Sequence, residues 1–239
     1  MHISRNVDNR GVGIHYIDSI DGSDPSLIPL VISPGLSETA EEYLELLEHM
    51  RPRRCVVLSY RGRGGSDTPV AGYNLADHIT DLASVIREAG LERYHMMGYS
   101  RGVSYALGYV LEHQEQVHSL IIEDYPAEHK QMPDGWAEDY IHNYLIPYYR
   151  TDNIRPEAVW GIQRESTQQQ LDKELDLPVL VQKGKLEGSL LNEEHIQGFK
   201  EIYQNVVIKE YYHSGHDIRS SEKLALYQDI KDFLAGVEK

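Results

Sequence analysis

A serine near the middle of the chain has a glycine two residues away on each side. The stretch Gly98-Tyr99-Ser100-Arg101-Gly102 follows the apolar run YHMMGY and precedes the helical pattern VSYALGYV. Glycines at this spacing let a strand and a helix pass closely around a strained serine, as a nucleophile elbow requires. An ordinary glycine-rich turn is the alternative, but the strand before and the helix after favour a nucleophile. We therefore predict that Ser100 is a catalytic nucleophile.

A serine hydroxyl is a weak nucleophile and needs a base that is itself oriented by an acid. His216 follows Gly215 in YYHSGHDIRSS, between the last apolar run and the last helical pattern. His213 is the rival, but it lies closer to the strand end, where it can simply pack. A metal site at His213 and His216 is disfavoured because no helix or third ligand supports it. We predict His216 as the base and no bound metal.

Two carboxylates lie between Ser100 and His216, in the chain order of serine, acid and histidine. Asp124 ends the run LIIED, and Glu187 lies in QKGKLEGS, after the following apolar run. Either residue could instead cap a helix or pair with an arginine. We expect the Arg101 side chain to pair with Asp124 or Glu123 as structural support.

Strands and helical patterns alternate along the chain, which predicts a parallel sheet covered on both faces. HISRNV and VGIHYIDSI flank Asp8-Asn9-Arg10-Gly11, whose residues suit a hairpin turn. Six further runs predict buried parallel strands: LIPLVIS, CVVLSY, YHMMGY, HSLIIED, PVLVQKG and VVIKEYY. Helices are expected over 38–50, 74–89, 103–113 and 221–235, the last capped by Asp217 or Ser220.

Residues 126–177 break this rhythm. They hold helical stretches such as GWAEDYIHNYLIPYY and RPEAVWGIQREST and no clear strand. We predict a small helical lid between the sixth and seventh strands, with residues 1–125 and 178–239 forming the core. The lid aromatics Trp136, Tyr140, Tyr144 and Trp160 would pack the lid onto the body or, with Tyr99, line a substrate pocket.

Composition limits the classes of partner. The 239 residues carry a formal net charge of −15, which argues against non-specific nucleic-acid binding. No apolar run is long enough to predict a membrane span, and the first residues contain no apolar signal-peptide core. A single cysteine, Cys55, excludes an internal disulfide and fits a reducing cytoplasm. We expect a cytoplasmic protein, with Cys55 as buried filler.

Several motifs in order resemble the α/β-hydrolase family over nearly the whole chain. Ser33-Pro34-Gly35-Leu36 stands where the family has its His-Gly loop, and Tyr60 to Asp67 is similar to its Asp-x-Arg-Gly-x-Gly-x-Ser turn. Gly184-Lys185-Leu186-Glu187 resembles its Gly-x-x-Asp turn, and Gly215-His216-Asp217 its final Gly-His.

The resemblance implies the α/β-hydrolase fold, with a mostly parallel eight-stranded sheet flanked by helices. It implies an oxyanion hole made by the backbone N–H groups of Leu36 and Arg101. It also favours Glu187 over Asp124 as the acid of a Ser100-Glu187-His216 triad.

This constellation predicts acyl transfer to water through an acyl-enzyme on Ser100. Our first expectation is a carboxylesterase for small or medium esters, with a small-molecule ester and water as its partners and no cofactor. Carbon–carbon bond hydrolysis of a diketone-like substrate is the enzymatic alternative. A catalytically silent, ligand-binding hydrolase fold is the non-enzymatic one.

Overall fold

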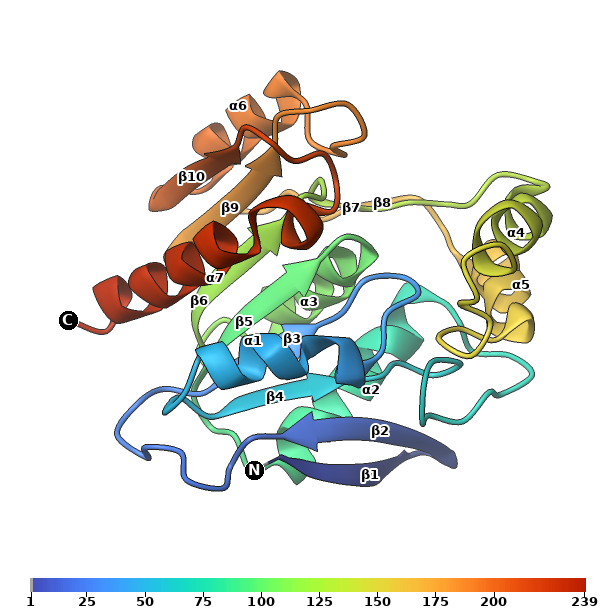
Figure 1. The fold of residues 1–239 in the computed structure, drawn as a ribbon, viewed down its shortest axis with the longest axis horizontal. Helices are drawn as coiled ribbons and strands as arrows, with labels where there is room; N and C mark the ends of the chain where they lie inside the picture. The colour runs from blue at the N-terminus through green and yellow to red at the C-terminus, as the bar shows by residue number, and fades with distance from the viewer. Residues whose placement is uncertain (1) are drawn as a thin grey trace.

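An eight-stranded sheet forms the centre of the molecule (Figure 1). This computed structural model describes residues 2–239. The strand order is β1-β2-β4-β3-β5-β6-β9-β10, and every pairing is parallel except those made by β2. The strands are β1 (Ile3–Asn9), β2 (Val12–Asp18), β3 (Leu30–Ser33), β4 (Cys55–Leu58), β5 (Tyr94–Tyr99), β6 (Val117–Glu123), β9 (Val179–Gly184) and β10 (Val206–Tyr211). The predicted mostly parallel, eight-stranded sheet is confirmed.

The first two strands form the predicted hairpin. Asn9 pairs with Val12, so Arg10 and Gly11 are the two residues of the turn. Both have positive φ, 54° and 89°, as a type I′ turn requires. The Asp8 carboxylate accepts a hydrogen bond from the Gly11 N–H at 3.0 Å and so closes the turn.

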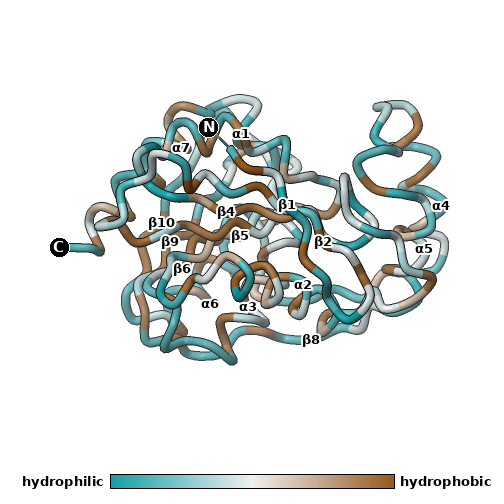
Figure 2. The backbone as a smooth tube through the Cα atoms, turned by 90° about the horizontal axis from the view of Figure 1, so that it is seen from below, coloured by the Kyte–Doolittle hydropathy of each residue, from teal (hydrophilic) through white to brown (hydrophobic). Residues whose placement is uncertain are grey.

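The inner strands β3, β4, β5 and β9 are buried at every residue, as expected for strands covered on both faces. The prediction of burial was wrong for most of β10, whose residues before the buried Tyr211 alternate between half-buried and exposed, with Val207 45% exposed. The reason is its position, because β10 is an edge strand and pairs only with β9. Figure 2 shows apolar segments concentrated along the strands in the middle of the molecule.

Helices cover both faces of the sheet, each with its own apolar core. On one face lie α2 (Leu75–Glu88), α3 (Arg101–Glu112) and α6 (Glu193–Ile202). On the other face lie the short 3-10 helix η1 (Ala40–Tyr43), α1 (Leu44–His49) and α7 (Ile218–Val237), whose N-cap is Asp217. Sequence reasoning missed α6, although its signals are present. The Asn192 side chain caps it, and Ile196 and Phe199 supply its buried face.

Residues 126–177 leave the sheet after β6 and return to it at β9. They contain α4 (Trp136–Tyr140), the π-helix η2 (Ile141–Leu145) and α5 (Pro156–Glu165), whose apolar side chains form a third core cluster. Figure 1 shows α4, in yellow-green, and α5, in yellow, beyond one end of the sheet. The expectation of no strand here was wrong, because β7 (Glu128–His129) and β8 (Gln169–Gln170) pair antiparallel. Two-residue strands are too short to produce a periodic pattern.

None of the helices within residues 2–239 combines the length and the apolar character needed to cross a bilayer.

Candidate active site

Ser100 lies at the junction of β5 and α3, in a backbone conformation that side-chain-bearing residues rarely adopt. Its φ is 51° and its ψ is −134°. The two flanking glycines are required because neither position has room for a side chain. A Cβ on Gly98 would lie 2.7 Å from the Val103 Cα, and one on Gly102 would lie 2.2 Å from the Pro34 carbonyl oxygen. The expected sharp strand–serine–helix turn is therefore present, and Ser100 lines a cavity.

His216 lies between Ser100 and Asp124 and forms a hydrogen bond with each of them. Its Nε2 is 2.9 Å from Ser100 Oγ, and its Nδ1 is 2.8 Å from Asp124 Oδ2. A carboxylate accepts, so Nδ1 donates to Asp124, and Nε2 is left to accept from the serine hydroxyl. The rival His213 is exposed, and its backbone N–H donates to Glu222.

Asp124 is completely buried and lies directly after β6, with a φ of 46°. Besides His216, its carboxylate accepts from the Ser189 hydroxyl at 2.6 Å, the Leu190 N–H at 2.9 Å and the Gly184 N–H at 3.3 Å. These donors come from the end of β9 and the loop after it. They fix the carboxylate in place and compensate its removal from water.

The structure corrects the expected placement of Glu187, because Asp124 and not Glu187 meets His216. Glu187 is exposed, and its side chain makes no hydrogen bond or ion pair with any residue in the range 2–239. The loop turns at Gly188, which has a φ of 95°, and then directs Ser189 and Leu190 at Asp124. The Glu187 side chain therefore points to solvent.

The expected pairing of Arg101 with Asp124 or Glu123 was also wrong. The buried Arg101 guanidinium donates to the Ser166 hydroxyl at 2.7 Å, the Lys130 carbonyl at 3.1 Å and the His129 ring at 3.2 Å. Burial and the nearby Arg101 charge lower the pKa of His129 to about 3, so its ring is neutral and can accept. Arg101 thus ties both ends of residues 126–177 to the turn that carries Ser100.

Two backbone N–H groups were expected to form an oxyanion hole. Arg101 is the first residue of α3, so its N–H has no acceptor within the helix. The loop after β3, which carries Leu36, is held to α3, because the Ser33 hydroxyl donates to the Gly102 carbonyl at 2.7 Å. Leu36 and Ser100 line the same cavity, and no hydrogen bond from the Leu36 N–H to another described residue is present. Both N–H groups are therefore available to a ligand.

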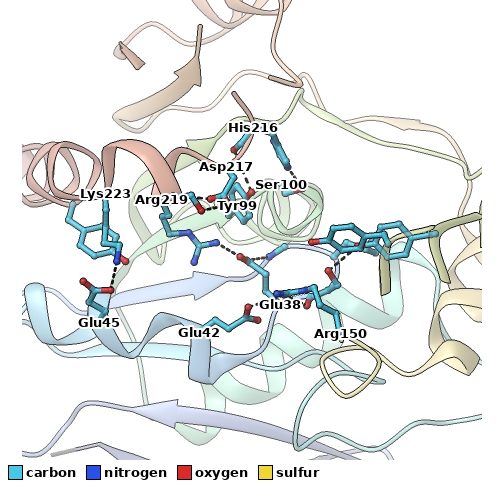
Figure 3. A pocket seen from close by; sticks show the side chains of 17 residues that line it. Glu38, Glu42, Glu45, Tyr99, Ser100, Arg150, His216, Asp217, Arg219 and Lys223 are labelled. Carbon is cyan, nitrogen blue, oxygen red and sulfur yellow. Dashed lines mark hydrogen bonds and ion pairs between the residues drawn. The ribbon is translucent and has the colours of Figure 1, made fainter. Parts of the chain in front are cut away.

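The cavity at Ser100 has a volume of about 740 Å³ (Figure 3). Of the five aromatic residues expected around a pocket, Tyr99, Tyr140 and Tyr144 line it. Trp136 and Trp160 do not. Trp136 stacks behind Tyr140 with ring centroids 5.3 Å apart, and Trp160 is 42% exposed on α5.

Charged side chains line much of the cavity, and sequence reasoning missed them. They form three ion pairs: Glu38 with Arg219, Glu42 with Arg150, and Glu45 with Lys223 (Figure 3). A usable signal was present, because Glu38 lies two residues after Leu36 and Arg219 lies three residues after His216. Glu38 lies just after the predicted oxyanion loop, and Arg219 lies in the first turn of α7, directly after the loop that carries His216.

Glu123, next to Asp124, is completely buried, and both of its carboxylate oxygens lack a hydrogen-bond partner among the described residues. Burial raises its pKa to about 8, with Glu38 and Asp124 adding to the shift and Arg219 opposing it. The side chain is therefore protonated and neutral at pH 7. Within residues 2–239, no three potential metal ligands come together.

The chain is similar to two curated proteins over part of its length. Over 113 residues the chain is 25% identical to a putative 2-succinyl-6-hydroxy-2,4-cyclohexadiene-1-carboxylate synthase of Bacillus subtilis, covering 46% of this chain and 41% of the relative. It is 31% identical over 110 residues to a fluoroacetate dehalogenase of Burkholderia sp., covering 44% of this chain and 36% of the relative. The matches thus span about two fifths of these relatives.

The crystal structure of the esterase RhEst1 from Rhodococcus sp. superposes with a TM-score of 0.80 at 16% identity, covering 98% of this chain and 99% of the esterase. This likeness is one of fold. The α/β hydrolase fold family itself matches residues 28–205, most of the chain. With an eight-stranded sheet and a serine at the turn between β5 and α3, the chain belongs to the α/β hydrolase fold family.

Proposed function

We propose that this chain is a serine carboxylesterase that hydrolyses small or medium carboxylic esters through an acyl-enzyme on Ser100. The observation that carries the proposal is the unbroken hydrogen-bonded row from Ser100 Oγ through His216 to Asp124, with distances of 2.9 and 2.8 Å. This row contains the nucleophile, the base and the orienting acid. The serine hydroxyl donates to His216, and His216 donates to Asp124.

In the proposed reaction, His216 Nε2 removes the Ser100 proton while Oγ attacks the ester carbonyl carbon. Asp124 stabilises the resulting imidazolium, and the N–H groups of Leu36 and Arg101 donate to the oxyanion. The imidazolium then protonates the leaving alcohol, which gives the acyl-enzyme. A water molecule, deprotonated by His216, then attacks the acyl carbon; the bond from that carbon to Ser100 Oγ breaks, the imidazolium returns its proton to Oγ, and the acid is released.

The character of the cavity supports a small or medium ester over a long-chain lipid. Among the residues that the structure describes, Leu36 is the only one with an aliphatic side chain in the lining, and the other lining side chains are polar, charged or aromatic. A long alkyl chain would gain about 0.8 kcal/mol for each methylene buried against apolar surface, and this cavity offers little such surface.

We further propose that residues 126–177 act as a lid that supplies one wall of the substrate site. Tyr140 and Tyr144 line the cavity and stack with ring centroids 5.0 Å apart. The Tyr140 hydroxyl donates to Ser37 Oγ at 2.9 Å, and Arg150 donates to the Ser37 carbonyl at 2.8 Å. Both contacts hold the segment beside the loop that contains Leu36.

Substitution of Ser100 and His216 tests the function. With a 4-nitrophenyl ester of a short acid, Ser100→Ala and His216→Ala should each lower kcat by about a thousand-fold or more. His213→Ala is the matched control, because His213 is exposed and lies three residues away in the same loop. Covalent labelling by a fluorophosphonate should occur in the wild type and be lost in Ser100→Ala.

Two outcomes would contradict the proposal. A folded Ser100→Ala protein that keeps more than a few per cent of kcat would exclude a serine enzyme. A wild type that binds small esters but is neither acylated nor labelled would be a silent ligand-binding fold.

A further inference from the structure

Arg219 lies in the first turn of α7, three residues after His216. Its guanidinium carbon is 4.4 Å from the ring centroid of Tyr43 and 4.7 Å from that of Tyr99, so the cation contacts two aromatic rings. The guanidinium also donates to Glu38 Oε1. Only 12% of the Arg219 side chain and 14% of the Glu38 side chain are exposed.

Glu38 connects this cation to the loop that carries Leu36. Its other oxygen, Oε2, accepts from the Gly35 N–H at 2.8 Å and from the Tyr43 hydroxyl at 2.5 Å. The Gly35 N–H immediately precedes the Leu36 N–H, the proposed oxyanion donor. A shift of the Glu38 carboxylate would therefore move the peptide group next to that donor.

Tyr99 connects the same cation to the proposed base. Its ring lies against the His216 ring with centroids 5.1 Å apart and an interplanar angle of 20°. Arg219 contacts the Tyr99 ring as well, so the Tyr99 ring links the guanidinium to the His216 ring. Figure 3 shows Arg219 and Glu38 directed at each other on one side of the cavity, with Ser100 and His216 beside them.

We infer that Glu38 and Arg219 form a positioning pair that aligns the oxyanion loop with His216. The inference rests on the proposed function. Neither residue has a hydrogen bond to Ser100, His216 or Asp124, so both act through Gly35 and Tyr99. Stability alone does not explain such a pair, because well-packed apolar residues often replace a buried ion pair without loss of stability. The pair holds the loop that carries Leu36 and the loop that carries His216 in a fixed relative orientation. The transition state must fit between these two loops.

The test measures kcat, KM and the rate of fluorophosphonate labelling in Glu38→Gln, Arg219→Gln, the double variant and Arg219→Lys. Another ion pair of α7, between Lys209 on β10 and Asp229, supplies the control Lys209→Gln. Lys209 is exposed and lies outside the cavity lining. Circular dichroism and thermal melts establish that each variant is folded.

Each Gln variant should lower kcat and the labelling rate by about 10- to 100-fold, as expected for displacement of a catalytic group by about 1 Å. KM should change by less than about threefold, because ground-state contacts remain. The double variant should lose no more than the worse single variant, because both break one unit. Arg219→Lys should recover part of the loss, and Lys209→Gln should match the wild type.

Wild-type labelling separates failure of this inference from failure of the proposed function. If the wild type is labelled at Ser100 and the folded Gln variants react at its rate, the positioning role is refuted and the proposed function stands. Losses that simply add in the double variant also refute it. If the wild type is not labelled, the proposed function fails and the inference fails with it. If Arg219→Gln does not fold, Glu38→Gln and Arg219→Lys decide the question by the same rates.

Discussion

Replacing Asp124 by asparagine tests the part of the site on which sequence and structure disagree. The amide has one acceptor oxygen and one NH₂ group, so two of the four interactions of the carboxylate, those made by one oxygen, must change. An NH₂ group at the Oδ2 position would face the Leu190 N–H and the His216 Nδ1, which now donates. At the Oδ1 position it would face the Ser189 hydroxyl, which can turn and accept, although the Gly184 N–H loses its weak partner.

The second orientation is favoured, and it leaves an oxygen in contact with His216 Nδ1. The His216 tautomer is then correct, and what the variant lacks is the negative charge opposite the developing imidazolium. For unit charges about 4 Å apart at an effective dielectric constant of about 20, that attraction is about 4 kcal/mol. A barrier increase of that size lowers kcat by about a thousand-fold.

The assay is ester hydrolysis with the active sites counted from the acyl-enzyme burst, and Glu187→Gln is the matched control. Glu187 is exposed and makes no hydrogen bond or ion pair with His216, so its variant should stay within about twofold of the wild type, as most surface substitutions do. Thermal melts check folding. The reasoning is refuted if Asp124→Asn keeps more than about a tenth of kcat, or if Glu187→Gln loses as much as Asp124→Asn.

Three further predictions concern stability and reactivity. Burial raises the pKa of Glu123 to about 8 from 4.5, so the folded state keeps a proton that the unfolded chain releases, and stability falls as pH rises between those values. The Tm of the wild type should therefore drop more than that of Glu123→Gln between pH 5 and 8, and parallel curves would contradict this. Gly102→Ala should lower the free energy of unfolding, measured in urea, by about 1–3 kcal/mol or more, because the added Cβ would lie 2.2 Å from the Pro34 carbonyl oxygen. Gly198→Ala on α6, where a Cβ meets nothing within 4 Å, is the control and should not destabilise, and equal losses would refute the steric argument. Burial raises the pKa of the Cys55 thiol to about 12, so iodoacetamide at pH 8 should alkylate it only after unfolding, and rapid native labelling would show that it is exposed.

Much of the site was predictable because its signals are local. Gly98 is required by Val103 of the same turn, and although Gly102 is required by the distant Pro34 carbonyl, both glycines and Ser100 lie in one five-residue motif. The strands followed from short apolar runs, since a strand buried on both faces needs apolar residues throughout. His216 could be placed because a loop between the last strand and the last helix offers few positions. The conformation of Ser100 and the order of strand, serine and helix are properties of one continuous segment.

The acid, the partner of Arg101 and the residues of the cavity wall depended on how distant segments approach one another. Asp124 is oriented by the end of β9 and by the loop that follows it, about 60 residues further along the chain. Arg101 pairs with groups other than Asp124 because residues 126–177 bring Lys130 and Ser166 to its guanidinium. Glu38 and Arg219 meet although 181 positions separate them. The physical reason is that sequence pattern specifies which face of an element is apolar, whereas the direction of a polar side chain in a loop is set by the donors and charges that the folded chain places around it.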